Sequence, residues 1–177
     1  MNIKEEAKAV KLASPKMAGT SEEARNKALL EVVKQLKARQ QEIFEANAMD
    51  LKQAEIDKVA APIIKRLKFD ETKLRDVIAG IEDLVKLEDP LFKQDMHRQL
   101  DEGLTLYRET CPIGVIGVIF EARPDALIQI SSLCIKSGNC VILKGGSETM
   151  NSNRVLFNII YEAVIKSGMP ENCMLQL

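Results

Sequence analysis

The chain has 177 residues, of which 46% are hydrophobic and 29% are charged, and its formal net charge is -1 at pH 7. Such a composition is typical of a globular protein with about one domain. Balanced acids and bases give no electrostatic reason to expect binding to nucleic acid or to an anionic membrane. No apolar run approaches the roughly 20 residues of a membrane-spanning helix, and the first residues lack the apolar core of a signal peptide, so we expect a cytoplasmic protein.

The cysteines and the single histidine show no spacing that is typical of a metal site, and no bound metal is expected. We interpret His97 as a surface or hydrogen-bonded histidine rather than as a catalytic base. We interpret the four cysteines as reduced core or surface thiols; they are Cys111, Cys134, Cys140 and Cys173.

Residues 1–94 are predicted to form a helical region. A helical spacing of apolar residues begins at Ile3, and Ser14-Pro15 predicts its end. A capping box, in which Thr20 accepts from the backbone amide of Glu23, predicts the start of a second helix. The apolar stripe of this second helix contains Ala24, Ala28, Leu29, Val32 and Leu36.

Two further helices are predicted in the same region. One runs from Gln40 to about Glu55, and its buried face is expected to contain Ile43, Phe44, Ala48 and Leu51. The other begins at Asp70, and its inner face is expected to contain Leu74, Val77, Ile78, Ile81 and Leu84. Basic residues of this region alternate with acidic ones, which is typical of a solvated helix face.

Residues 95–111 are predicted to form a β-ribbon. After Asp89-Pro90 the spacing of the apolar residues changes from helical to alternating. Two extended segments between His97 and Thr110 are joined near Gly103, which suits a hairpin turn.

Residues 112–177 predict an incomplete Rossmann-like domain, so the expected fold class is α/β. Val115–Phe120 and Val141–Leu143 are apolar runs that predict two buried parallel strands. A crossover helix is predicted between them, from Arg123-Pro124 to a stop at Gly138-Asn139. A long helix from Ser147 and a third strand over residues 173–177 are expected to follow.

Parallel strands place ligands beyond their carboxyl ends, so the candidate site lies at residues 121–123 and 144–148. The two glycines at 145 and 146 let the backbone approach a ligand closely, and the helix start at Ser147 offers free amides to an anion. By itself this is a weak signal for ligand binding, because most turns between strand and helix contain glycine and the sequence has no GxGxxG fingerprint.

The same segments carry a family resemblance. The runs PIGVIGVIFEARPD, LCIKSGN and VILKGGSE, followed by NSNR, closely resemble gamma-glutamyl phosphate reductases, which are members of the aldehyde dehydrogenase superfamily. The resemblance extends through the N-terminal runs NKALLEVVKQL and EIFEANAMDL and covers nearly the whole chain. It implies N-terminal helices, a β-ribbon and part of a cofactor-binding sheet of the aldehyde dehydrogenase type.

For the cofactor, the resemblance implies NADPH or NADP. Lys144 would hold the adenosine ribose together with Ser147 or Glu148. A lysine and a serine hydroxyl suit a 2′-phosphate and favour NADPH, whereas Glu148 pointing inward would favour NADH. The resemblance assigns the remaining cofactor contacts to the backbone at Phe120, Glu121 and Ala122 and to the turn residues Gly145 and Gly146.

Arg123 stands where many relatives in the superfamily carry an asparagine that stabilises an oxyanion. A guanidinium offers a bidentate fork to phosphate or carboxylate, so Arg123 is a candidate for contact with an acyl phosphate substrate. The alternative is an arginine that caps its helix region and pairs with Glu121 or Asp125.

The reaction implied by the resemblance is the NADPH-dependent reduction of L-glutamate 5-phosphate to L-glutamate 5-semialdehyde and phosphate, in proline biosynthesis. A cysteine thiolate forms the acyl-enzyme in such a mechanism, and none of the four cysteines suits that role. We therefore expect an N-terminal fragment, without the catalytic domain, that is inactive alone and tends to associate. The alternative is a non-catalytic nucleotide-binding or interaction module.

The resemblance also implies partners. It predicts a homo-oligomer that forms through the β-ribbon, a small acyl phosphate as substrate, and possible contact with the glutamate 5-kinase that supplies this substrate.

Overall fold

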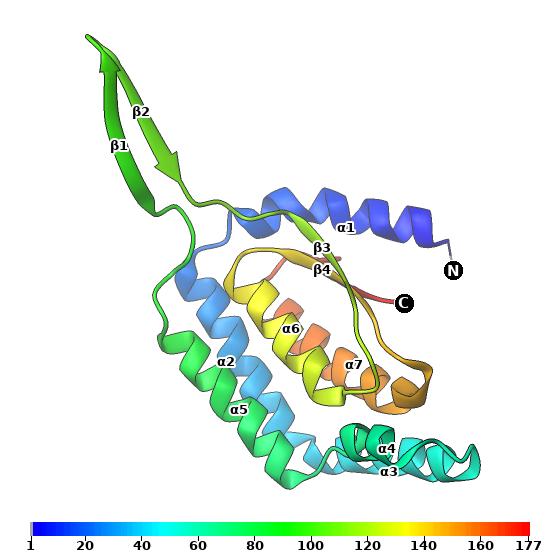
Figure 1. The fold of residues 1–177 in the computed structure, drawn as a ribbon. Helices are drawn as coiled ribbons and strands as arrows, with labels where there is room; N and C mark the ends of the chain where they lie inside the picture. Colours follow the sequence, from blue (N-terminus) through cyan, green and yellow to red (C-terminus); the bar gives the residue numbers. More distant parts are fainter. Residues whose placement is uncertain (1) are drawn as a thin grey trace.

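The computed structural model describes residues 2–177 and shows a mixed α/β fold in which a two-stranded ribbon projects from a layered body (Figure 1). The helices are α1 (Ile3–Ala18), α2 (Glu22–Ala38), α3 (Gln40–Ile56), α4 (Ala61–Leu67), α5 (Glu71–Lys86), α6 (Pro124–Lys136) and α7 (Met150–Lys166), with a short 3-10 turn at Ser147–Thr149. The strands are β1 (Gln94–Asp101), β2 (Leu104–Glu109), β3 (Val115–Ile119), β4 (Cys140–Lys144) and β5 (Met174–Gln176). None of these helices is long and apolar enough to cross a membrane.

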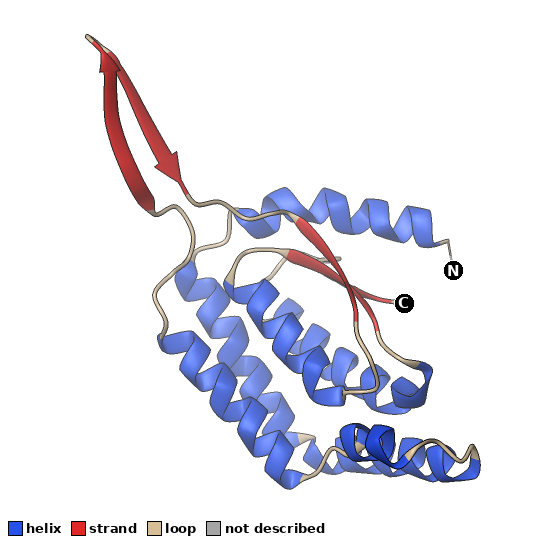
Figure 2. Cartoon of the chain, in the orientation of Figure 1, coloured by secondary structure: helices blue, strands red, loops and turns tan. Residues whose placement is uncertain are grey.

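The body is built in layers around a parallel sheet of order β3-β4-β5 (Figure 2). Helix α1 covers one face of the sheet, whereas α6 and α7 cover the other and pack in turn against α2 and α5. The strand, crossover helix, strand and turn predicted for residues 115–146 are thus confirmed. The prediction that both strands are buried is wrong for β3, because β3 lies at the edge of the sheet and leaves Ile119 87% exposed.

Helix α1 continues past Pro15, where the sequence predicted its end. A proline leaves the carbonyl four residues earlier without its usual amide donor. Here the hydroxyl of Ser14 donates to that carbonyl, on Lys11, at 2.9 Å. The extra turn also buries Met17 completely in the core, so burial and a local side-chain bond outweigh the cost of the proline.

The predicted capping box of α2 is displaced by one residue. Ser21, rather than Thr20, is the N-cap, and its hydroxyl accepts from the amide of Ala24 at 3.2 Å. Thr20 instead donates to the carbonyl of Met17, which closes the end of α1. Asp70 caps α5 as expected by accepting from the amide of Lys73.

The buried face of α3 differs from the apolar one expected. Ile43 is buried as predicted, but Ala48 is exposed and the positions turned inward include the polar residues Asn47 and Asp50. A polar residue is stable in the interior only when its hydrogen bonds are satisfied. Both side chains find partners on other helices, and these partners shape the candidate site described below.

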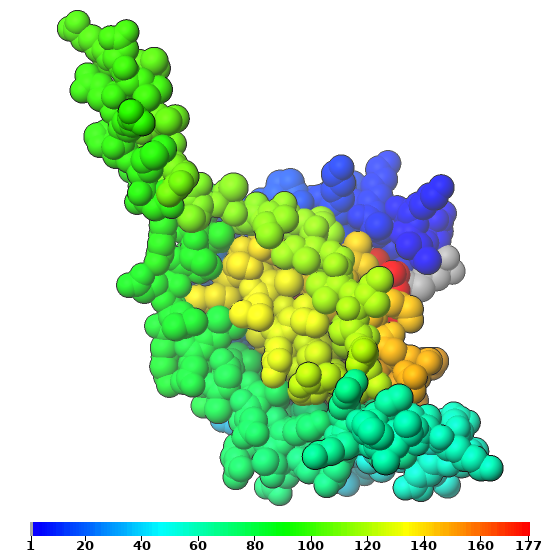
Figure 3. All heavy atoms as spheres, viewed as in Figure 1, coloured from blue at the N-terminus to red at the C-terminus, as the bar shows by residue number. Residues whose placement is uncertain are grey.

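The β-ribbon stands away from the body, as Figure 3 shows for the green arm. Strands β1 and β2 pair antiparallel, with Gly103 at the turn in a left-handed conformation (φ 76°). His97 is exposed on the ribbon and stacks on Tyr107, with ring centroids 4.8 Å apart. The ribbon also exposes Leu100, Leu104 and Leu106, an unusual set of apolar side chains for a two-stranded arm.

Candidate functional site

The carboxyl ends of β3 and β4 lie side by side, as the predicted topology requires. Ile119 pairs with Lys144 in the parallel register, and the amide of Phe120 donates to the carbonyl of Lys144 at 3.0 Å. The segments that follow the two strands therefore leave the sheet from neighbouring points. The structure brings together all eight residues predicted to contact a cofactor: Phe120, Glu121, Ala122, Lys144, Gly145, Gly146, Ser147 and Glu148.

Gly145 and Gly146 differ in how closely other groups approach them. A Cβ atom on Gly146 would lie 3.4 Å from the amide nitrogen of Ala122 and 2.7 Å from a carboxylate oxygen of Glu148. A Cβ atom on Gly145 would lie 2.2 Å from the side-chain nitrogen of Asn153. Gly145 therefore has no room for a Cβ atom beside Asn153, whereas a Cβ atom on Gly146 would need only the flexible Glu148 side chain to move. Without a side chain, Gly146 leaves the space between the turn and the end of β3 open to a ligand.

A hollow of about 330 Å³ opens at this turn and is lined by Ile63, Arg66, Glu121, Ala122, Gly146 and Glu148. Two of these residues belong to α4, a helix that the sequence analysis did not predict. Arg66 donates to Glu121 at 2.7 Å and so spans the space between α4 and the end of β3. The available signals were Pro62 at the second helical position and the spacing of Ile63 and Leu67, but seven residues are too few to show a clear period.

Asp50 of α3 fixes the first turn of α7. Its buried carboxylate accepts from the amides of Asn151 and Ser152 at 3.1 and 2.8 Å, and from both of their side chains. The expectation of free amides at this helix start is therefore wrong for residues 151 and 152, because a carboxylate of the same chain already occupies them. The helix also starts later than expected, at Met150, after the 3-10 turn.

Asn47, one turn before Asp50 on α3, links α4, which forms one wall of the hollow, to the start of α7. Its side chain accepts from the amide of Phe69 at 2.8 Å and donates to the carbonyl of Leu67 at 2.9 Å, which holds the end of α4. It also donates to the hydroxyl of Ser152 at the start of α7. The apolar spacing of α3 predicts only a packing face, and a buried asparagine or aspartate cannot be recognised from sequence before its partners are known.

The three polar side chains predicted at the ribose lie on the surface of the turn. Lys144 is exposed, and its ammonium donates to the carbonyl of Gly145 at 3.2 Å. Ser147 is exposed at the start of the 3-10 turn. Glu148 folds back over Gly146 and lines the hollow, which is the inward orientation that favours a ribose hydroxyl as its partner.

Arg123 lies beside the site and pairs with Asp125 at 3.0 Å. Its guanidinium is about half exposed, whereas Asp125 is buried at the first turn of α6, where its other carboxylate oxygen has no hydrogen-bond partner. Glu121, the other partner considered, pairs with Arg66 instead. The structure therefore shows the ion pair with Asp125 and leaves the guanidinium accessible from solvent.

The cysteines lie away from this site. Burial raises the pKa of the Cys134 thiol to about 11, that of Cys140 to about 11 and that of Cys173 to about 12. A thiol in this state is a poor nucleophile at neutral pH, because the thiolate is the reactive form. Cys111 is exposed at the base of the ribbon.

These environments predict a simple result for thiol labelling at pH 8. Cys111 should react with an aromatic disulfide reagent in the folded chain, and the three buried cysteines should react only after denaturation. The measurement is the absorbance of the released thiolate before and after addition of denaturant, with Cys111→Ser as control. More than one fast-reacting thiol in the folded protein would contradict the assignment.

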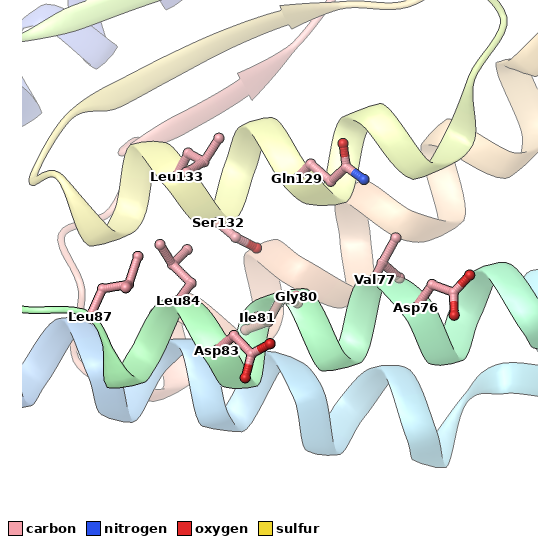
Figure 4. A pocket seen from close by; sticks show the side chains of 10 residues that line it. All are labelled: Asp76, Val77, Gly80, Ile81, Asp83, Leu84, Leu87, Gln129, Ser132 and Leu133. Carbon is pink, nitrogen blue, oxygen red and sulfur yellow. The ribbon is translucent and has the colours of Figure 1, made fainter.

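A second, more apolar hollow of about 350 Å³ lies between α5 and α6 (Figure 4). Its walls include Val77, Ile81, Leu84 and Leu133, and Gly80 leaves one side open. No residue from the strand ends lines this groove, and its polar side chains do not converge on one point. It is therefore not the candidate site for chemistry.

Comparison with known proteins connects this geometry to one enzyme family. The chain is 54% identical over 172 residues to a gamma-glutamyl phosphate reductase of Acetivibrio thermocellus and 51% identical over 170 residues to one of Pelotomaculum thermopropionicum. These alignments cover 97% and 96% of the chain but only 40% and 39% of the relatives. The chain thus spans about two fifths of the length of these curated relatives.

Solved structures agree with this result. Crystal structures of gamma-glutamyl phosphate reductases from Thermotoga maritima and Saccharomyces cerevisiae superimpose on the whole chain with a TM-score of 0.95 each, at 30% and 37% identity, and the chain covers 43% and 46% of them. A methylmalonate-semialdehyde dehydrogenase from Oceanimonas doudoroffii shares the fold, with a TM-score of 0.70 at 19% identity. No family model matches the chain.

Proposed function

Since this chain is homologous over nearly its whole length to gamma-glutamyl phosphate reductases, we propose that it forms the cofactor-binding part of such an enzyme. The complete protein would reduce L-glutamate 5-phosphate with NADPH and a proton, and would release L-glutamate 5-semialdehyde, phosphate and NADP in proline biosynthesis. The observation that carries the proposal is the contact between the glycine turn and the end of β3, at the carboxyl ends of two adjacent parallel strands.

In this proposal each segment of the site has a separate role. The backbone of Phe120, Glu121 and Ala122 lines the dinucleotide on one side, and Gly145 and Gly146 allow its approach on the other. Lys144 binds the adenosine ribose or its 2′-phosphate, with Ser147 or Glu148 as second partner. Because Glu148 lines the hollow, the orientation that favours a free ribose hydroxyl, NADH is the alternative cofactor. The dinucleotide supplies the hydride, and the residues of this chain bind and orient it.

Arg123 is proposed to contact the substrate. Its guanidinium is accessible beside the end of β3, and its pairing with Asp125 uses only part of its donor capacity. The nucleophilic cysteine is proposed to lie outside these 177 residues, because the three buried thiols are held in the protonated form and Cys111 is at the base of the ribbon.

We propose that the enzyme is a cytoplasmic homo-oligomer. The exposed leucines of the ribbon would be covered by a second subunit, because moving apolar side chains out of water lowers the free energy. We also propose contact with the glutamate 5-kinase that produces the acyl phosphate, because direct transfer would protect a substrate that is unstable in water.

The cofactor assignment is tested by Lys144→Ala in a full-length enzyme that contains this chain. Losing one charge-assisted contact should raise the Michaelis constant for NADPH by about ten- to a hundredfold, with a smaller change for the acyl phosphate. Steady-state kinetics of NADPH oxidation measure both constants.

The matched control for this experiment is Lys52→Ala, which removes an exposed lysine of α3 and should change neither constant. An unchanged constant for NADPH together with a raised constant for the substrate would show that Lys144 belongs to the substrate site instead.

A further inference from the structure

We propose that Arg66 is a positioning residue of the cofactor site: it neutralises Glu121 and thereby permits a negatively charged dinucleotide to approach the end of β3. The inference rests on the cofactor-binding role proposed above. It concerns a residue from a helix that contributes no catalytic group and that no sequence motif singles out.

The charges around the hollow require such a residue. Glu121 and Glu148 both line it, and Arg66 is the only cationic side chain among the lining residues. Glu121 belongs to the backbone segment that would line the cofactor and itself lines the hollow, so its carboxylate would lie near a dinucleotide bound there. Two uncompensated carboxylates there would repel a dinucleotide, which carries negative charge on its phosphates.

Arg66 is well placed to compensate one of these charges. Its guanidinium lies 2.7 Å from a carboxylate oxygen of Glu121, on the side of α4 that faces the hollow. The pair is open to solvent, with side-chain exposures of 52% for Arg66 and 78% for Glu121. An exposed pair of this kind contributes little to folding stability, so its removal should leave the fold intact.

The backbone beneath Arg66 is held firmly. Leu67 is completely buried, and its carbonyl accepts from Asn47. The carbonyl of Arg66 accepts from the ammonium of Lys73 at 3.0 Å. These contacts fix the start of the side chain relative to α3 and α7, and hence relative to the glycine turn.

The test is NADPH binding to a full-length enzyme that contains this chain, measured from the change in NADPH fluorescence at low and at high ionic strength. Arg66→Gln should weaken binding about three- to tenfold at low salt, as expected for an unscreened carboxylate near the ligand. The difference from the unmodified enzyme should shrink at about 1 M salt, where the Debye length is only about 3 Å. Loss of a purely structural contact would not depend on salt in this way.

Two matched variants make the result specific. Lys65→Gln removes the same charge from the neighbouring exposed position of α4, outside the hollow, and should change the affinity less than twofold. The double variant Arg66→Gln with Glu121→Gln should bind NADPH within about twofold of the unmodified enzyme, because the charge that Arg66 neutralises is then absent.

Each outcome has a separate meaning. If the double variant binds as weakly as Arg66→Gln, or if Arg66→Gln behaves like Lys65→Gln, the neutralising role is wrong. If Lys144→Gln also weakens binding, the cofactor site stands whatever Arg66 does. If the unmodified enzyme binds no NADPH, the proposed function itself is wrong; if it binds NADPH and Arg66→Gln binds equally well, only the role of Arg66 is wrong.

Discussion

Replacing Asp50 with alanine should lower the free energy of unfolding by about 3 to 5 kcal/mol, the largest effect expected of any single substitution described here. The carboxylate is buried and accepts four hydrogen bonds from Asn151 and Ser152 at the start of α7. Alanine would leave these donors without a partner in the interior and would remove the cap of the helix. Equilibrium unfolding in urea, monitored by circular dichroism, measures the loss.

Two further variants separate this role from the effect of any lost charge. Glu55→Ala removes an exposed carboxylate from the same helix and should change the free energy of unfolding by less than about 0.5 kcal/mol. Asp50→Asn keeps one acceptor oxygen and should give an intermediate loss. A stability of Asp50→Ala within 1 kcal/mol of Glu55→Ala would mean that water replaces the carboxylate without penalty.

The second large effect is a loss of stability in alkali. Burial raises the pKa of Cys134 and Cys140 to about 11 and that of Cys173 to about 12, against about 8.5 for a thiol in an unfolded chain. Between these values the unfolded chain releases protons that the folded chain retains, so the free energy of unfolding falls as the pH rises. The contribution of these thiols is fully present below about pH 8.5 and is lost as the pH rises to about 11 for Cys134 and Cys140 and to about 12 for Cys173.

The limiting slope is about 1.4 kcal/mol per pH unit for each thiol that is ionised only in the unfolded chain. Urea unfolding at several pH values between 8 and 11 measures it. Cys173→Ala should reduce the slope by up to about 1.4 kcal/mol per pH unit, the contribution of one thiol. Cys111→Ser should leave the slope unchanged, since Cys111 is exposed in the fold. Equal slopes for Cys173→Ala and the unmodified chain would show that Cys173 does not contribute to the alkaline loss, and equal slopes after replacement of all three buried cysteines would show that none of them does.

The agreement between sequence and structure is closest where local signals suffice. Pro124 at the first helical position and Gly138, with φ 65°, bound α6 as predicted, and Asp70 caps α5. The turn at Gly145-Gly146 was predicted between a strand and a helix, and in the structure it connects β4 to the 3-10 turn that precedes α7. Each of these features depends on the conformational preference of one or two residues, so it can be read without knowing the neighbours in space.

The structure differs from the sequence-based predictions where the environment of a residue depends on groups that are distant in the sequence. The extension of α1 past Pro15 depends on the burial of Met17, and the exposure of β3 depends on its place at the edge of the sheet. The candidate site shows the same division. Its glycine turn was predicted, but the ion pair between Arg66 and Glu121 joins residues 55 positions apart.

By itself the sequence determined the order of the elements apart from α4, the parallel βαβ unit and the segment that carries the glycine turn, because periodicity, caps and turn residues act over a few positions. Only the tertiary structure decided that Asp50 occupies the amides at the start of α7 and that α4 forms a wall of the hollow. A buried carboxylate or a surface cation takes its role from the groups that surround it, and chain folding brings these groups together from separate helices.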